Sequence, residues 1–202
     1  MLQLFSIITA LAGFIASPLL HAQQPAQATK PASLPNESFM SQISPILKHV
    51  QTKSKITLHE GLPHQLWDKE LLAAELKKQK HEMRQGFAFY VPAQSSNIVP
   101  EDRKQLLAIL ADPESYEPYS GPKRCGGYHP DFSVEFQSGK HLVEIQLCFG
   151  CHESKLFLDG KFKLHTDLKG RTMTKLEPLL RRYHQENPRK EHYLKKIKEQ
   201  AE

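Results

Sequence analysis

The stretch DFSVEFQSGKHLVEIQLCFGCHESKLFLDGKFKLH, residues 131–165, decides the fold. Apolar and polar residues alternate in two runs on either side of a Ser-Gly-Lys turn, which predicts two antiparallel strands. Two further short runs flank Asp159-Gly160, a dipeptide that favours a tight hairpin turn. The stretch therefore predicts a four-stranded antiparallel meander.

Helical patterns lie on both sides of this meander. Residues 68–85 have acidic residues in the first turn, strong helix formers throughout and Gly86 at the expected stop. The other predicted helices are a short one within 39–50, one that opens at Pro100 and one over 174–185 that begins with a Thr-x-x-Glu capping box. Short strands are predicted at 56–58 and 87–91. The order of elements predicts an α+β fold, an antiparallel β-meander with helices packed on one face.

The two ends of the chain differ from its middle. Residues 1–22 have the pattern of a signal peptide, 23–38 that of a disordered linker, 39–188 form one predicted α+β domain, and 189–202 are a charged tail. We expect an exported protein, periplasmic or secreted, with no stable membrane insertion once the signal is cleaved. If the signal is not cleaved, its apolar run becomes a membrane anchor.

Composition narrows the classes of function. The chain has 202 residues, a formal net charge of +5 and 24% charged residues, which is typical of a globular domain. The basic residues are spread along the chain and interspersed with glutamate, so no nucleic-acid partner is expected. The partner is otherwise left open.

The informative motif is Cys148-Phe149-Gly150-Cys151-His152, together with an upstream Cys125-x-x-x-His129. The first interpretation is a zinc-type metal site with Cys125, His129, Cys148 and Cys151 as its four ligands. The second is covalent haem c, with Cys148 and Cys151 as thioether attachments, His152 as the proximal ligand and Met173 as a possible distal ligand.

Two other interpretations use only sulfur. Cys125 could form a structural disulfide with Cys148 or with Cys151, the usual role of cysteine in an exported protein. Alternatively, Cys148 and Cys151 could carry out thiol–disulfide exchange, although a strand rather than a helix is predicted to follow them. The favoured expectation is a non-enzymatic protein whose Cys/His cluster binds a metal or is locked by a disulfide.

Other candidate catalytic motifs do not fit. In the run from His59 to His64 the two histidines are five residues apart with Gly and Pro between them, which is incompatible with a helical H-E-x-x-H zinc motif. No nucleophile elbow or phosphate-binding glycine loop is present. Glu135 and Glu144 are expected to face each other across the first hairpin, with Lys140 or Lys155 nearby.

Two resemblances accompany the motif. The segment Leu147-Cys148-Phe149-x-Cys151, with its upstream cysteine, is similar over residues 125–160 to uncharacterised exported bacterial proteins in which C-F-x-C ends a strand. That resemblance implies export and no particular activity. The five residues of C-x-x-C-H also resemble those of c-type cytochromes, which would imply covalent haem and electron transfer.

Overall fold

The computed structural model describes residues 36–78, 80–92 and 98–183. The predicted signal peptide, most of the linker and the charged tail lie outside the described residues. Among the described helices, none is long and apolar enough to cross a membrane.

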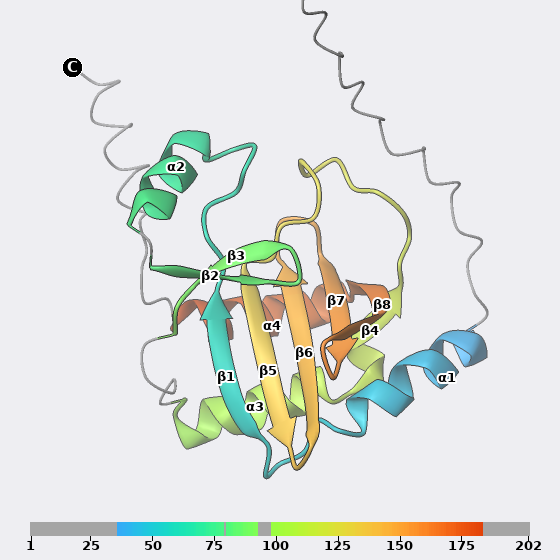
Figure 1. The fold of residues 1–202 in the computed structure, drawn as a ribbon. Coiled ribbons are helices and arrows are strands. Elements are labelled where there is room, and N and C mark those ends of the chain that lie inside the picture. The colour runs from blue at the N-terminus through green and yellow to red at the C-terminus, as the bar shows by residue number, and fades with distance from the viewer. Residues whose placement is uncertain (1–35, 79, 93–97, 184–202) are drawn as a thin grey trace, which may run out of the picture.

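A six-stranded antiparallel sheet forms the centre of the domain (Figure 1). Its strands, in spatial order, are β1 (Lys55–Glu60), β5 (Phe132–Ser138), β6 (His141–Cys148), β7 (Glu153–Leu158), β8 (Lys161–Leu168) and β4 (Tyr116–Pro118). The four central strands follow one another along the chain, as the alternating pattern of residues 131–165 predicts. The α+β fold with an antiparallel meander is confirmed.

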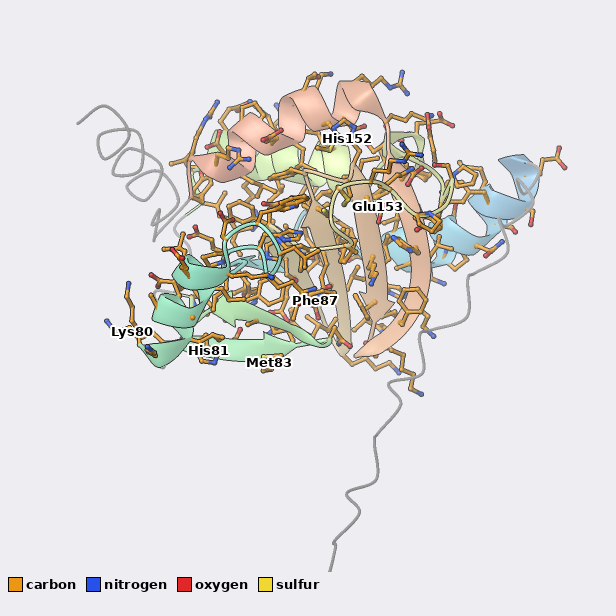
Figure 2. The ribbon with its side chains drawn as sticks, turned by 90° about the horizontal axis from the view of Figure 1, so that it is seen from above. Lys80, His81, Met83, Phe87, His152 and Glu153 are labelled. Atoms are coloured by element: carbon orange, nitrogen blue, oxygen red, sulfur yellow. A yellow bond between two sulfur atoms is a disulfide. The ribbon has the colours of Figure 1, made fainter. Side chains whose placement is uncertain are left out.

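Three helices cover one face of this sheet, as Figures 1 and 2 show. They are α1 (Asn36–Leu47), α3 (Pro100–Leu110) and α4 (Gly170–Arg181), and a short 3-10 helix, Pro113–Ser115, precedes β4. On the opposite side lie α2 (Lys69–Lys77) and a separate hairpin of β2 (His81–Arg84) and β3 (Phe87–Tyr90). The sheet is therefore covered on both sides, once by helices and once mainly by the hairpin.

Three predicted boundaries are wrong. The predicted helix over 68–85 ends at Lys77, because the chain turns back into the β2–β3 hairpin, whose turn residues Gln85 and Gly86 have φ of 48° and 85°. The predicted helix over 174–185 begins instead at Gly170. Its Thr174 hydroxyl donates to a carbonyl within the helix, and Thr174 is not a cap. Residues 36–38, assigned to the linker, form the first turn of α1.

The alternation of side chains divides the sheet into two unlike faces. Apolar side chains of the strands pack against α1, α3 and α4 in one core, in which Phe132, Val134, Phe136, Ile145, Leu147 and Leu156 have 0% exposure. The intervening residues point to the other face and are polar or charged. Many of these are also buried, because the hairpin and a long loop lie over them: Ser133, Glu144, Gln146 and Glu153 are at most 4% exposed.

Candidate functional site

A disulfide joins Cys125 to Cys151, with 5.7 Å between their Cα atoms. Cys151 lies in the four-residue turn between β6 and β7, whereas Cys125 lies in the segment between β4 and β5 that we call the disulfide loop, residues 119–130. Both sulfur atoms lie close to the Gly127 carbonyl oxygen, Cys125 at 3.7 Å and Cys151 at 3.4 Å. Of the sequence interpretations, the structural disulfide is the one whose geometry is present.

The zinc and haem interpretations both require Cys151 as a free thiolate or thioether. In the structure the disulfide occupies Cys125 and Cys151, and His129 Nε2 lies 2.7 Å from the Leu62 carbonyl oxygen. Among the described residues, no three His, Cys, Asp or Glu side chains are arranged to hold a metal ion. The predicted four-ligand set therefore does not fit a metal while this bond is intact.

The haem ligands are also dispersed. His152 is exposed at the end of the β6–β7 turn, in a left-handed conformation with φ of 56°. Met173, the possible distal ligand, lies on α4 and is buried in the core on the helix-covered face. The structure does not bring Met173 and His152 together around a common site.

Cys148 remains as a free, buried thiol at the end of β6. Burial raises its pKa to about 11, although backbone groups of His129 and Cys151 hydrogen-bond the sulfur and lower the pKa in part. Cys148 pairs with Glu153 across the β6–β7 hairpin and points to the polar face of the sheet. All three cysteines are thus gathered where the disulfide loop covers this face.

Aromatic contacts hold the disulfide loop against the polar face. Tyr119 stacks on His165, with 3.8 Å between ring centres, and His165 Nε2 lies 3.0 Å from the buried Glu153 carboxylate. Further along the loop, the Lys155 ammonium lies 4.2 Å from the centre of the Tyr128 ring. Burial lowers the pKa of Lys155, while the neighbouring Glu153 acts to raise it.

The disulfide loop also contacts the segment between β1 and α2. The Trp67 Nε1 donates a hydrogen bond of 2.9 Å to the Cys125 carbonyl. A Cβ atom at Gly126 would lie 2.7 Å from Trp67 Nε1, so glycine is required for this close approach. A second close approach occurs at Gly61, where a Cβ atom would lie 2.0 Å from the Pro130 carbonyl oxygen. The disulfide therefore anchors a loop that is packed against the start of α2.

An apolar pocket of about 220 Å³ lies between this segment, α2 and the hairpin. Leu72 and Leu76 of α2 form one wall, Met83 and Phe87 of the hairpin form another, and His129 of the disulfide loop closes a third. Phe87 in turn packs edge-on against Tyr128, with 5.5 Å between ring centres. The position of the disulfide loop thus sets the shape of the pocket. None of the sequence interpretations identified it, because its walls come from three separate segments.

Exposed apolar side chains occur in the pocket wall and in the segment that leads into α2: Leu76 and Met83 line the pocket, and Leu66 and Trp67 directly follow its lining residue Gln65. Trp67 is 66% exposed, Met83 65%, Leu66 50% and Leu76 39%, and together they make up four of the seven exposed large apolar side chains in the described part of the chain. Clustered exposure of this kind marks an interaction surface more often than scattered single residues do. Figure 2 shows Met83 beside Lys80 and His81 on the outer side of the hairpin.

Over residues 69–80, which contribute one wall of the pocket, exposed lysines outnumber exposed carboxylates. Lys69 and Lys77 of α2 and Lys80 after it are exposed, and within the described residues no carboxylate forms an ion pair with any of them. Glu75 is already paired with Lys78 at 2.7 Å. Unpaired lysines beside an apolar pocket favour a ligand that carries negative charge.

A cluster of buried charges holds the hairpin on the sheet. Arg84 of β2 forms ion pairs with Glu135 of β5 and, at 3.6 Å, with Glu144 of β6. His59 of β1 lies between Glu135, at 3.1 Å, and Glu82 of β2, at 2.8 Å. We call these five residues the carboxylate cluster. The cross-strand Glu135–Glu144 pair expected from the sequence is present. Its counter-charge is Arg84, and not Lys140 or Lys155 as expected.

Interactions within the carboxylate cluster favour the ionised forms of Glu135 and Arg84. Burial favours the neutral form of Glu135, but hydrogen bonds and charge from His59 and Arg84 outweigh it and hold the pKa of Glu135 below its usual range. Burial likewise opposes the charge on Arg84, yet Glu135, Glu144 and Glu82 raise its pKa. Glu144 also accepts from Ser133 at 2.8 Å and from Gln146 at 3.0 Å. We interpret this cluster as structural support for the hairpin wall of the pocket.

Comparison of the chain with protein-family models, curated proteins and solved structures finds no match to any of them. The resemblances to exported C-F-x-C proteins and to c-type cytochromes therefore stay predictions.

Proposed function

We propose that this chain is an exported, disulfide-locked recognition domain without a catalytic role. It binds a protein partner through the apolar pocket between α2 and the hairpin. The observation that carries the proposal is a preformed hollow whose lining residues Leu76 and Met83 are exposed, with the exposed Leu66 and Trp67 directly after its lining residue Gln65.

The size of the pocket points to a side chain as the bound group. Sites for small-molecule ligands usually have volumes of roughly 300–1,000 Å³. The pocket here has about 220 Å³, which suits one large apolar side chain inserted from a partner. Such anchors in well-packed pockets supply most of the binding energy of many protein interfaces.

The charge of the surroundings defines the partner further. Lys69 and Lys77 lie on α2, which forms one wall of the pocket, and Lys80 directly precedes the hairpin that forms another. None of the three has a carboxylate partner among the described residues. A partner segment with acidic residues on both sides of its apolar anchor would complement them. The proposed ligand is therefore an acidic peptide segment with a central phenylalanine or leucine.

The test uses Met83 as a reporter in the intact chain with isotope-labelled methionine methyl groups. Met40 is packed at the core and Met173 is buried in it, so among the described methionines only Met83 lies at the pocket. The probes are the synthetic peptides Asp-Glu-Phe-Glu-Asp, its Ala-centred analogue, and Lys-Lys-Phe-Lys-Lys. We expect the Met83 methyl resonance to shift progressively with the first peptide and much less with the other two.

Two variants make this titration specific. Leu76→Lys places a charge in the pocket wall and is expected to abolish the shift, whereas Phe162→Lys makes the same change at an apolar position that is 56% exposed on β8, outside the pocket. Equal shifts with the Phe-centred and Ala-centred peptides would contradict the proposal. A larger Met83 shift with anionic phospholipid vesicles than with the peptide would replace the protein partner by a membrane surface.

A further inference from the structure

Two of the three cysteines are bonded to each other, and the third, Cys148, lies three residues before the bonded Cys151. Cys148 and Cys151 are the first and last residues of a C-x-x-C turn at the end of β6. The first and fourth residues of a turn have Cα atoms within about 7 Å of each other, a separation that a disulfide can bridge. Both residues are buried, with Cys148 3% and Cys151 5% exposed, and Cys151 is bonded to Cys125.

We infer that the three cysteines form an exchange unit in which Cys148 and Cys125 compete for Cys151. The Cys148 thiol loses its proton to water, and the resulting thiolate attacks the sulfur of Cys151. The Cys148–Cys151 bond forms while the Cys125–Cys151 bond breaks. The electron pair leaves on the Cys125 sulfur, which takes up a proton from water, so one disulfide and one thiol are present before and after.

The exchange changes the surface of the molecule. Cys148 is 3% exposed, whereas Cys125 is partly exposed in the disulfide loop, so the exchange replaces a buried thiol by an accessible one. It also releases the covalent anchor of the loop whose His129 closes the pocket. The consequence is control of the recognition site by disulfide pairing. This consequence rests on the proposed function, whereas the exchange itself does not.

A ligand in the pocket is expected to oppose the exchange. Binding selects the form in which the pocket wall is intact, and that form has the Cys125–Cys151 bond. Conversely, the exchanged form presents a Cys125 thiol beside Trp67, where a partner's disulfide could react with it. A partner that contains a disulfide would then be captured as a mixed disulfide: the Cys125 thiolate attacks one sulfur of that disulfide, and the other sulfur leaves and takes up a proton to become a thiol.

The experiment maps the free thiol in the full oxidised chain. Samples held at about pH 7, 8 and 9 are quenched with acid, unfolded, labelled with N-ethylmaleimide, and digested for mass spectrometry. We expect the label on Cys148 at the start and a growing share on Cys125. The initial rate is expected to rise about tenfold per pH unit, because the thiolate fraction does so below the Cys148 pKa of about 11. Label that stays on Cys148 alone after a day at about pH 9 would overturn the inference.

Two variants test the same unit without any ligand. Cys148→Ala has no free thiol, so it is expected to show no labelling of Cys125 at any pH. Cys125→Ala leaves Cys148 and Cys151, which are expected to form a disulfide on treatment with oxidised glutathione. If both thiols persist in this folded variant, Cys148 and Cys151 cannot reach each other to form a disulfide, which would overturn the inference. Because Cys148→Ala keeps the loop anchored, its Met83 response to the peptide tests the pocket separately from the exchange.

Discussion

The Trp67 indole donates a hydrogen bond of 2.9 Å to the carbonyl of Cys125, a residue 58 positions further along the chain. This contact connects the surface around the pocket to the disulfide, since Cys125 is bonded to Cys151. Trp67 is also the only tryptophan in the chain, so its fluorescence reports on this one connection. The predictions below use it wherever the disulfide loop is concerned.

Adjacent glycines in the disulfide loop should respond differently to substitution. Gly126 and Gly127 have φ of 86° and 94°, so alanine is strained at both, by about 1–2 kcal/mol. Only at Gly126 does the added Cβ collide with Trp67; at Gly127 nothing lies within 4 Å. We expect Gly126→Ala to shift the Trp67 emission and Gly127→Ala to leave it unchanged at similar stability. A matching emission shift in the Gly127 variant would show that Trp67 responds to loop strain and not to contact.

Removing the disulfide should destabilise the fold without abolishing it. The bond closes a loop with a sequence separation of 26, for which chain entropy gives a contribution of about 3.5 kcal/mol. The double variant Cys125→Ala/Cys151→Ala is therefore expected to lower the free energy of unfolding in urea by about this amount. Circular dichroism of the sheet should be unchanged, because the core strands do not depend on the bond. A loss below about 1 kcal/mol would show that the disulfide loop is held mainly by its aromatic contacts.

Replacing Arg84 should lower the free energy of unfolding more than replacing an exposed arginine does. Replacing it with methionine leaves the carboxylates of Glu135 and Glu144 buried without their cation, an effect of about 3 kcal/mol. Arg171→Met is the matched control, since Arg171 is 69% exposed and its loss is expected to change stability by less than about 1 kcal/mol. Urea unfolding of both variants measures the difference. Adding Glu135→Gln to the Arg84 variant is expected to restore part of the lost stability.

The carboxylate cluster also predicts a dependence of stability on pH. The pKa of Glu135 is lower in the folded protein than in the unfolded chain, where it is about 4.3. The folded state therefore keeps this group ionised when the unfolded state binds a proton. Its stabilisation is complete above the unfolded pKa and is lost as the pH falls through the lower, folded value.

Glu135→Gln is expected to flatten the acid limb of a plot of urea midpoint against pH. Glu37→Gln, at an exposed site in the first turn of α1, serves as the control and should leave that limb unchanged. The same slope in the wild type and in the Glu135 variant would mean that Glu135 is not held ionised by His59 and Arg84.

The sheet could be predicted from sequence because its side chains alternate strictly. In β5 and β6 the apolar positions Phe132, Val134 and Ile145 fall on one face and the polar positions on the other, a pattern that only a strand explains. The burial of the polar face could not be predicted. This face is covered by the β2–β3 hairpin, whose strands have only four residues each and follow a helix-forming sequence. The turn between them is not Asn-Gly or Asp-Gly, so the usual hairpin signal is missing.

The candidate site shows the same limit. The cysteine motif drew attention to the correct region, but the sequence left the partner of Cys125 open between Cys148 and Cys151. The choice depends on direction: Cys148 points from the strand to the covered polar face, and Cys151 sits in the turn that the loop reaches. The pocket is formed from α2, the hairpin and His129, which only the tertiary structure brings together.

The most direct test of the account is a titration of Trp67 fluorescence with the peptide Asp-Glu-Phe-Glu-Asp. It compares the oxidised wild type with the Cys125→Ala/Cys151→Ala variant, which lacks the anchor of the loop. We predict saturable binding to the wild type and no binding to Leu76→Lys. Binding to the disulfide variant should be at least tenfold weaker than to the wild type, a difference of about 1.4 kcal/mol. Equal affinity for wild type, disulfide variant and Leu76→Lys would contradict the claim that the disulfide loop shapes a pocket for an apolar side chain.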